Sequence, residues 1–275
     1  MASEGLQGHR ARKRFGQNFL HDRHWIERIA KAVNATEGDD IVEIGPGQAA
    51  LTRELIAGAG KVRAVEIDRD LAAWLKETFP ESLSLIEADA LTLDWTQVAK
   101  NDNLRVVGNL PYNISSPLLF KLLEAADHVK DQHFMLQKEV VERMVAQHGS
   151  KTYGRLSVML QWRYRMQKLF DVPPGAFNPP PKVMSSVVRM IPKAKEEVPS
   201  VDFELFSSVV ANAFSQRRKT IRNALSALLS AEEIAACDVD PGARAEALPL
   251  DAFVRLAQKA EALGRKAVTP GTTVD

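Results

Sequence analysis

The stretch Ile41-Val42-Glu43-Ile44-Gly45-Pro46-Gly47-Gln48-Ala49-Ala50 places a short apolar run directly before a G-x-G-x-x-A pattern. Residues 48–59 then carry apolar side chains at helical spacing. A strand, a glycine turn and a helix in this order are typical of the ligand-binding start of an open α/β sheet, because small residues let a ligand approach the backbone. The pattern alone is weak evidence, since an ordinary tight turn would also explain the glycines.

The chain beyond this stretch alternates between strand-like and helix-like segments. We expect strands at 61–67, 83–86, 104–107 and 133–136, helices at 71–79, 117–126, 139–146 and 155–161, and a late pair of strands at 163–170 and 185–191. Such alternation predicts an α/β fold with a Rossmann-like, mostly parallel sheet, helices on both faces and a late antiparallel hairpin.

The C-terminal part has a different pattern. Residues 192–202 contain two prolines and little apolar content, which indicates a linker. Beyond it, apolar residues recur at helical spacing and predict a small all-α domain. We therefore divide the chain into a large domain at 1–195, whose residues 1–30 form a basic N-terminal arm and lid, and a helical domain at 196–275.

Composition excludes several classes of protein. The single cysteine, Cys237, rules out a disulfide framework and any zinc site built on two or more thiolates. No apolar run approaches the roughly 20 residues of a membrane helix. We expect a cytoplasmic protein with no membrane segment and no metal.

The formal net charge of +1 conceals two opposite segments. Residues 37–103 hold 14 acids against 6 Lys+Arg, net −8, whereas residues 151–195 hold 9 Lys+Arg against the single acid Asp171, net +8. Two further runs, at 9–14 and 207–225, carry basic residues and no acid. The basic segments are either solvated faces or, as we favour, surfaces that bind a polyanion.

Polar side chains follow the next three expected strands in the pattern of a cofactor pocket. Glu66 ends the second strand and suits the two hydroxyls of a ribose, and Asp89 follows the third and suits an adenine amine. Asn109 follows the fourth strand. A cationic sulfonium would favour this acidic segment, so the pattern predicts S-adenosyl-L-methionine rather than a pyrophosphate cofactor, which would favour basic residues.

Asn109-Leu110-Pro111-Tyr112 is the most specific motif in the chain. The exocyclic amine of adenine is a poor nucleophile, because its lone pair is delocalised into the ring. The side-chain oxygen of Asn109 and the backbone carbonyl of Leu110 could accept hydrogen bonds from that amine, while Pro111 fixes the turn. Tyr112 could stack on an extruded base. Methyl transfer in this site would depend on proximity and orientation, with no strong general base.

Longer motifs carry a resemblance that covers residues 8 to about 250. They are Ala11-Arg12-Lys13-Arg14-Phe15-Gly16-Gln17-Asn18-Phe19-Leu20, Gly108-Asn109-Leu110-Pro111-Tyr112-Asn113, His133-Phe134-Met135-Leu136-Gln137-Lys138-Glu139-Val140, Phe177-Asn178-Pro179-Pro180-Pro181-Lys182-Val183 and Phe214-Ser215-Gln216-Arg217-Arg218-Lys219-Thr220. With these motifs the chain resembles the rRNA adenine N6,N6-dimethyltransferase family, and within it the bacterial small-subunit type. The resemblance implies a class I methyltransferase fold and dimethylation of two adjacent adenosines in the 3′-terminal hairpin loop of 16S rRNA, during ribosome biogenesis.

The resemblance also assigns roles to individual residues. Asn18 and Leu20 look like lid residues over the methionine end of the cofactor, and Phe177 looks like a second aromatic that flanks the target base. The other cofactor contacts that it implies are Gly45, Gly47, Glu66, Asp89 and Asn109. Read without the family, Phe177 before three prolines is more simply a buried anchor.

The basic runs then predict contacts to RNA phosphates. The residues are Arg12, Lys13, Arg14, Arg217, Arg218, Lys219 and Arg222. We expect the last four to lie on about one and a half turns of helix, with positions 218 and 222 on one face. The implied partner is the small ribosomal subunit, and we expect a monomer.

Three other functions stay open on the sequence. A large-subunit rRNA adenine methyltransferase that confers antibiotic resistance would share both catalytic motifs. A binding factor for ribosome assembly would keep methylation secondary. An NAD-dependent dehydrogenase fits the glycine turn but is disfavoured by residues 109–112.

Overall fold

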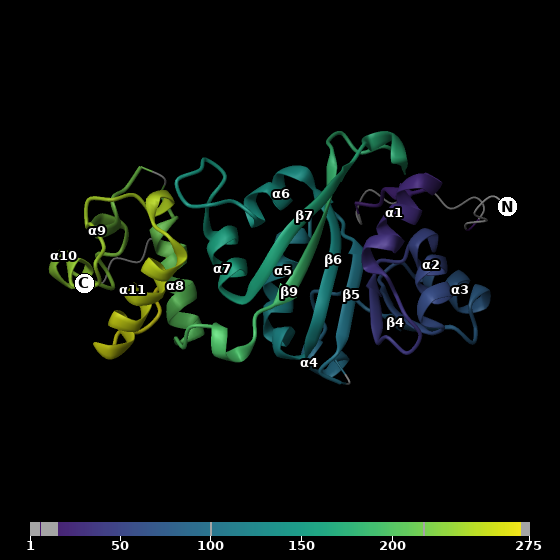
Figure 1. Ribbon diagram of the computed structural model, residues 1–275, viewed down its shortest axis with the longest axis horizontal. Helices are drawn as coiled ribbons and strands as arrows, with labels where there is room; N and C mark the ends of the chain where they lie inside the picture. Colours follow the sequence, from purple (N-terminus) through teal and green to yellow (C-terminus); the bar gives the residue numbers. More distant parts are fainter. Residues whose placement is uncertain (1–5, 7–15, 100, 217, 271–275) are drawn as a thin grey trace. The chain divides into compact units, whose positions relative to one another are not determined.

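The computed structural model describes residue 6 and residues 16–99, 101–216 and 218–270. The chain divides into two compact units, residues 1–141 with 165–192 and residues 142–164 with 193–275. The first unit is built on a seven-stranded sheet and the second on helices (Figure 1). The predicted α/β class, with a mostly parallel sheet, a late antiparallel hairpin and a helical C-terminal region, is confirmed.

The described strands form two sheets. They are β1 (Phe19–Leu20), β2 (Ile41–Ile44), β3 (Val62–Glu66), β4 (Leu83–Glu87), β5 (Leu104–Asn109), β6 (Val129–Gln137), β7 (Tyr164–Val172), β8 (Phe177–Asn178) and β9 (Ser185–Pro192). The large sheet has the order β4-β3-β2-β5-β6-β9-β7, and β1 pairs with β8 outside it. The pairs from β4 to β6 are parallel, and β9 is antiparallel to β6.

Helices connect and follow these strands. The α-helices are α1 (Arg23–Val33), α2 (Ala50–Ala59), α3 (Arg69–Thr78), α4 (Trp95–Val98), α5 (Ser115–Leu122), α6 (Lys138–Met144), α7 (Arg155–Arg163), α8 (Phe203–Ala213), α9 (Ile221–Ala224), α10 (Ala231–Ala235) and α11 (Leu250–Ala262). Short 3-10 helices lie at Leu123–His128, Pro174–Ala176, Lys195–Glu197 and Ala245–Ala247.

β2, the first strand of the large sheet along the chain, is buried on both faces of the sheet. All four residues of β2 are buried, which is the usual environment of a strand in a parallel sheet. Glu43 is the polar exception in this strand, and Thr52 Oγ1 on α2 donates to its carboxylate at 2.6 Å. This contact fastens the start of α2 to the strand and fixes the glycine turn between them.

Aspartates at the starts of helices explain several helix boundaries. Asp22 accepts a hydrogen bond from the backbone of the first turn of α1, Asp68 does so for α3, and Asp202 does so for α8. Because Asp68 lies two residues after Glu66, the last residue of β3, the cap also fixes the end of β3 beside the glycine turn.

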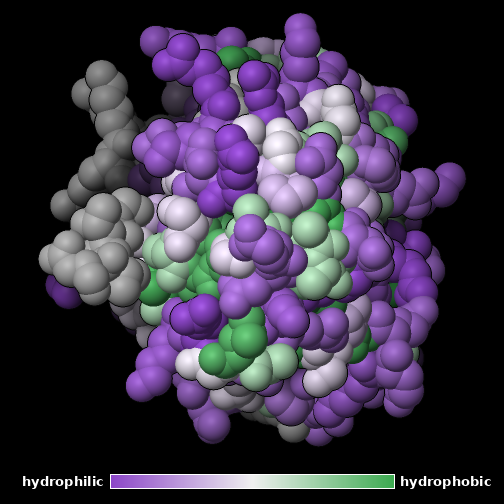
Figure 2. All heavy atoms as spheres, turned by 90° about the vertical axis from the view of Figure 1, so that its left-hand side faces the viewer, coloured by the Kyte–Doolittle hydropathy of each residue, from purple (hydrophilic) through white to green (hydrophobic). Residues whose placement is uncertain are grey.

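The second unit is a set of packed helices. α8 packs against α7 and α11, and the indole ring of Trp162 contacts the rings of Phe203 and Phe206, with centroids at 5.6 and 5.5 Å. Residues 142–164 thus belong with the helices that follow the 192–202 segment. Figure 2 looks onto this helical side, where hydrophilic residues cover most of the surface and apolar residues form separate patches.

The prediction of a helix through the C-terminal basic run, residues 217–222, is wrong. α8 ends at Ala213 and α9 begins only at Ile221, so residues 218–220 lie in a turn. The backbone N–H of Ile221 donates to Ala243 at 2.8 Å, and Thr220 forms a bridge with Arg244. Pairing with residues 243–244 therefore takes this segment out of helical conformation.

Candidate functional site

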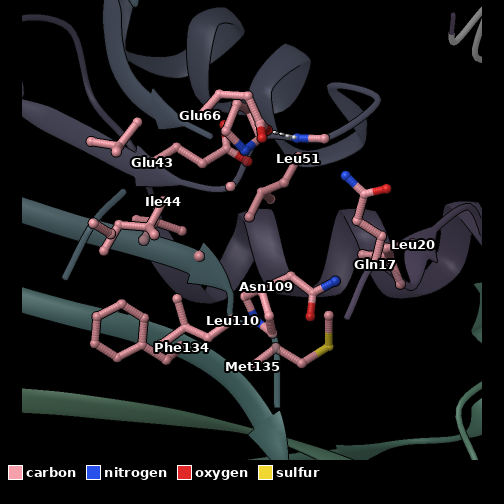
Figure 3. A pocket seen from close by; sticks show the side chains of 18 of the residues that line it. Gln17, Leu20, Glu43, Ile44, Leu51, Glu66, Asn109, Leu110, Phe134 and Met135 are labelled. Atoms are coloured by element: carbon pink, nitrogen blue, oxygen red, sulfur yellow. Dashed lines mark hydrogen bonds between the residues drawn. The ribbon is translucent and has the colours of Figure 1, made fainter. Parts of the chain in front are cut away.

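A cavity of about 330 Å³ opens at the carboxyl ends of the parallel strands in the first unit. Its lining comes from residues 16–20 around β1, the turn after β2, the ends of β3 and β4, the segment 108–114 after β5, and residues 133–135 of β6. Figure 3 shows Glu66 on one side of this pocket, Asn109 on another, and Gln17 and Leu20 on the segment that faces them. The volume and place fit a small-molecule site at the edge of an α/β sheet.

The glycine turn gives the cavity one of its walls. Gly45 and Gly47 have φ angles of 68° and 55°, which residues with a Cβ rarely adopt. A Cβ on Gly45 would meet nothing nearer than the Asn109 carbonyl oxygen at 4.0 Å, so it would project into open space in the cavity. A Cβ on Gly47 would lie 3.0 Å from the Phe19 ring. The glycines thus keep space for a ligand and let β1 approach the turn.

Glu66 is held in place by backbone donors. Gly47 N–H donates to one carboxylate oxygen at 3.3 Å and Asp68 N–H donates to the other at 2.9 Å. Burial raises the pKa of Glu66, and these N–H groups oppose that shift. Each carboxylate oxygen has a second lone pair, so the group can still accept from a ligand hydroxyl.

Asp89 and Glu43 add acidic character to the same cavity. Asp89 accepts the backbone N–H of Leu91 at 2.9 Å and lines the pocket. Glu43 is buried beneath the glycine turn, and this burial raises its pKa to about 7. Three carboxyl groups and an open glycine turn fit an adenosine-bearing cation such as S-adenosyl-L-methionine, whose ribose and amine donate hydrogen bonds.

Asn109 lies at the end of β5 with a defined side-chain orientation. Its amide nitrogen donates to the backbone carbonyl of Asn18 at 3.1 Å. The side-chain oxygen is therefore the group that can accept from a ligand. Leu110 next to it is 1% exposed, and its N–H donates to Met135 on β6 at 3.1 Å. The sheet edge thus fixes the backbone that carries both predicted acceptors.

Tyr112 is half-buried and lines the cavity. Its hydroxyl lies 2.8 Å from Ser185 Oγ, at the start of β9. Burial raises the pKa of the Tyr112 phenol, so the ring stays neutral. Pro111 precedes it, and its carbonyl accepts from Ser115 Oγ at 3.0 Å. The ring is therefore anchored at its hydroxyl end by a strand residue distant in sequence.

The predicted lid residues lie on β1 and its approach. Leu20 pairs with Phe177, and Phe19 pairs with Asn178, so the lid strand is joined to the segment after β7. Gln17 Nε2 donates to Asp68 Oδ2 at 3.0 Å, which ties the approach to the start of α3. Asn18 and Leu20 both line the cavity.

Phe177 is placed differently from the other predicted site residues. It is 3% exposed, packs in the core of the first unit and is not among the described residues that line the cavity. The structure therefore shows the buried anchor that its sequence context suggested. A stacking role would require β8 to move, and that role stays a prediction.

The predicted RNA contacts are only partly described. Arg12, Lys13, Arg14 and Arg217 lie outside the described residues. Arg218, Lys219 and Arg222 are exposed on the second unit. Their exposure suits a polyanion but does not identify one.

Two residues of the site were missed by sequence reasoning. Gln17 contacts Asp68, and Ser185 contacts Tyr112, across 51 and 73 positions of chain. Both lie inside family motifs or next to one, which is the signal that could have found them. Among the described residues, no group of three His, Cys, Asp or Glu side chains could hold a metal ion, and no helix has the length and apolar content of a membrane span.

Comparison with known proteins gives consistent matches along almost the whole chain. Residues 8–261 match the ribosomal RNA adenine dimethylase family. The chain is 58% identical over 241 residues to "Ribosomal RNA small subunit methyltransferase A" of Thiobacillus denitrificans, covering 87% of this chain and 94% of that protein. It is 53% identical to the protein of the same name from Pseudomonas aeruginosa, covering 95% of this chain and 99% of that one.

Solved structures agree with the sequence matches. A dimethyladenosine transferase from Plasmodium falciparum has a TM-score of 0.79 at 26% identity, covering 91% of this chain and all of that chain. The 23S rRNA methyltransferase ErmE has a TM-score of 0.68 at 26% identity, covering 89% of this chain and all of that chain. The fold is that of a class I methyltransferase, and the chain belongs to the ribosomal RNA adenine dimethylase family.

Proposed function

We propose that this enzyme uses S-adenosyl-L-methionine to dimethylate the N6 amines of two adjacent adenosines in the 3′-terminal hairpin loop of 16S rRNA, as a step of ribosome biogenesis. Relatives at 53–58% identity that are named for the small subunit support this substrate. The large-subunit alternative has less support, since the structure named for 23S rRNA is 26% identical to this chain.

One observation supports the chemistry most directly. The hydrogen bond from the Asn109 amide nitrogen to the Asn18 carbonyl fixes the orientation of the Asn109 amide. Its side-chain oxygen therefore remains available to accept a hydrogen bond from the substrate. The Leu110 carbonyl belongs to the next residue on the same fixed backbone. The Asn109 side-chain oxygen and the Leu110 carbonyl would together accept both hydrogens of an N6 amine and draw its nitrogen lone pair out of conjugation with the ring.

The remaining site residues would position the two reactants. Glu66 would accept hydrogen bonds from the ribose of the cofactor, and Asp89 from its adenine. The glycine turn would let the cofactor lie close to the backbone. Tyr112, held by Ser185, would stack on the extruded target adenine. Bound S-adenosyl-L-methionine would supply the methyl group as an electrophile on its sulfonium sulfur, and Asn109 and Leu110 would hold the amine nitrogen that accepts it.

We place the other predicted residues in supporting roles. Asn18 and Leu20 would cover the cofactor, and Gly45 and Gly47 would leave it room. Arg218, Lys219 and Arg222, with the basic residues 12–14 and 217, would bind RNA phosphates. We further propose that residues 1–195 carry catalysis and 196–275 face the RNA, and that the enzyme acts as a monomer in the cytoplasm.

The test is methyl transfer from labelled cofactor to isolated ribosomal subunits that lack the modification. We expect label in small subunits and not in large subunits, and mapping of the 16S rRNA should place dimethyladenosine at two adjacent positions of the 3′-terminal hairpin. Label confined to large subunits would favour the resistance methyltransferase instead. Absence of label from all RNA would refute the proposed function.

A role as an assembly factor with secondary methylation is tested separately. A variant without methyl transfer that still binds small subunits would be introduced into a strain that lacks the gene. Full rescue of subunit assembly by that variant would favour the binding role over catalysis.

A further inference from the structure

A cluster of charged side chains at the edge of the sheet has no role in the proposed function so far. Asp171, near the end of β7, contacts Lys168 Nζ at 2.8 Å and Lys138 Nζ at 2.9 Å. Ser186 Oγ on β9 donates to the same carboxylate at 2.6 Å. We call Lys138, Lys168 and Asp171 the lysine clamp.

The carboxylate of the clamp is anchored from below. Ser186 is fully buried, so its hydroxyl holds Asp171 against the sheet. The side chains of Lys138 and Lys168 remain 38% and 29% exposed. Hydrogen bonds from Lys168, Ser186 and Lys138 hold the pKa of Asp171 well below its usual range, so Asp171 is a carboxylate. Two lysines therefore share the one carboxylate of Asp171.

The clamp is linked to the acceptor motif through the start of β9. Lys138 directly follows β6, whose last residue pairs with Ser185 on β9. Ser185 is the residue that bonds the Tyr112 hydroxyl, and Ser186 next to it bonds Asp171. Consecutive residues of a strand point to opposite faces, so the start of β9 holds Tyr112 on one face and Asp171 on the other. Because β9 starts beside the carboxyl end of β6, the two faces meet at the rim where the cavity opens, and an RNA strand with a base at Tyr112 would pass this rim.

The chemistry of the clamp suits a phosphate. A lysine ammonium carries three N–H donors, so it can bond Asp171 and a second oxygen acceptor at once. A lysine that is already ordered by an ion pair loses less side-chain freedom when it binds. Asp171 is also the single acid among the 9 Lys+Arg of residues 151–195, so its place inside a basic segment calls for a function beyond charge balance.

On the footing of the proposed function, we propose that Lys138 and Lys168 bind a backbone phosphate of the RNA beside the target adenosine. Asp171 is a positioning residue that orders both ammonium groups before the RNA arrives. The clamp would thereby set the register of the RNA strand, so that the correct base reaches Tyr112.

The experiment measures methyl transfer to unmodified small subunits by the full-length enzyme and its variants Lys138→Gln, Lys168→Gln and Asp171→Asn. Lys76→Gln is the matched control, because Lys76 is also an exposed lysine in an ion pair, with Glu87, but lies on α3 next to β4 at the other end of the strand order. The KM for subunits, kcat, cofactor affinity and thermal unfolding are measured for each protein.

We expect each lysine variant of the clamp to raise the KM for subunits about fivefold to tenfold. Cofactor affinity and kcat should stay within twofold of the parent values, and the temperature of thermal unfolding should stay close to that of the parent. The slope of log KM against log salt should fall by about 0.7 for each lysine, the change expected for one lost phosphate contact on a single strand. Lys76→Gln should match the parent in KM and in slope.

Asp171→Asn separates positioning from simple charge. Removing an acid adds positive charge, which by itself would lower the KM for RNA. Positioning by Asp171 predicts the reverse, a KM about threefold higher with unchanged kcat. A lower KM in Asp171→Asn would overturn the positioning role, and parental KM and salt slope in both lysine variants would overturn the clamp. If the parent labels no RNA, the proposed function fails and the clamp fails with it, whereas a labelling parent with unaffected variants refutes the clamp alone.

Discussion

The substitution Asn109→Ala tests the centre of the proposed chemistry. It removes a side-chain oxygen that would accept from an amine which becomes positively charged during transfer, and a hydrogen bond of that kind contributes about 1.5–3 kcal/mol. Since each 1.36 kcal/mol is tenfold in rate, kcat should fall by about 10- to 150-fold. The variant also loses the 3.1 Å bond to Asn18, a neutral contact that contributes about 1 kcal/mol, so cofactor affinity should fall by about fivefold.

The assay is single-turnover transfer of labelled methyl to small subunits, with cofactor affinity measured by calorimetry. Asn109→Asp is the matched comparison, because it keeps an acceptor oxygen but cannot donate to Asn18. We expect it to keep a larger share of kcat than Asn109→Ala. A kcat for Asn109→Ala within threefold of the parent, with normal folding, would refute the acceptor role.

Three further predictions concern the stability of the fold and the cofactor side of the site. Arg105 is 6% exposed and pairs with Asp131 at 2.9 Å, so Arg105→Leu leaves a buried carboxylate unpaired and should lower the free energy of unfolding by about 3–5 kcal/mol in urea titrations; a loss below about 1 kcal/mol would contradict this. Gly47→Ala puts a Cβ 3.0 Å from Phe19 at a φ of 55°, and calorimetry should show cofactor affinity reduced by about tenfold or more, whereas an unchanged affinity would mean that the lid adjusts freely. Burial raises the pKa of Glu43 from 4.5 to about 7, so the unfolded chain loses this proton at a lower pH than the folded chain does. The contribution of Glu43 to the free energy of unfolding therefore falls as the pH rises from 4.5 to about 7. Glu43→Gln should remove that part of the pH dependence and be more stable than the parent at pH 8 in urea titrations, and a less stable variant at pH 8 would contradict the assignment.

The cofactor side of the site could be predicted because parallel strands impose it. When consecutive β-α units form one sheet, the residues that end each strand meet at the same edge. Glu66, Asp89 and Asn109 were placed by that rule alone, and all three line one cavity. The nature of the substrate could not be derived in this way, and it came from the longer motifs, whose family assignment is confirmed.

The remaining contacts depend on tertiary pairings that no local pattern encodes. The bond between Tyr112 and Ser185 joins residues 73 positions apart, through the antiparallel register of β9 on β6. Residues 218–220 leave the helical pattern because the segment at 243–244 supplies backbone partners. The helical spacing of apolar residues correctly indicated which residues of this segment are buried, but it did not predict the backbone conformation of residues 218–220.

The two-residue pairing of β1 with β8 has a consequence for repeated turnover. An enzyme that adds two methyl groups to each of two adenosines must replace spent cofactor several times. The strand that closes the cavity is held by the Leu20–Phe177 and Phe19–Asn178 pairs and by backbone bonds from residues 21 and 22 to Ala176. Releasing so short a ladder leaves the seven-stranded sheet intact, so β1 can separate from β8 on the microsecond to millisecond scale of lid motions without unfolding that sheet. The stability of the fold would then depend on the large sheet, and the time for which each cofactor stays bound would depend on the β1–β8 pairing.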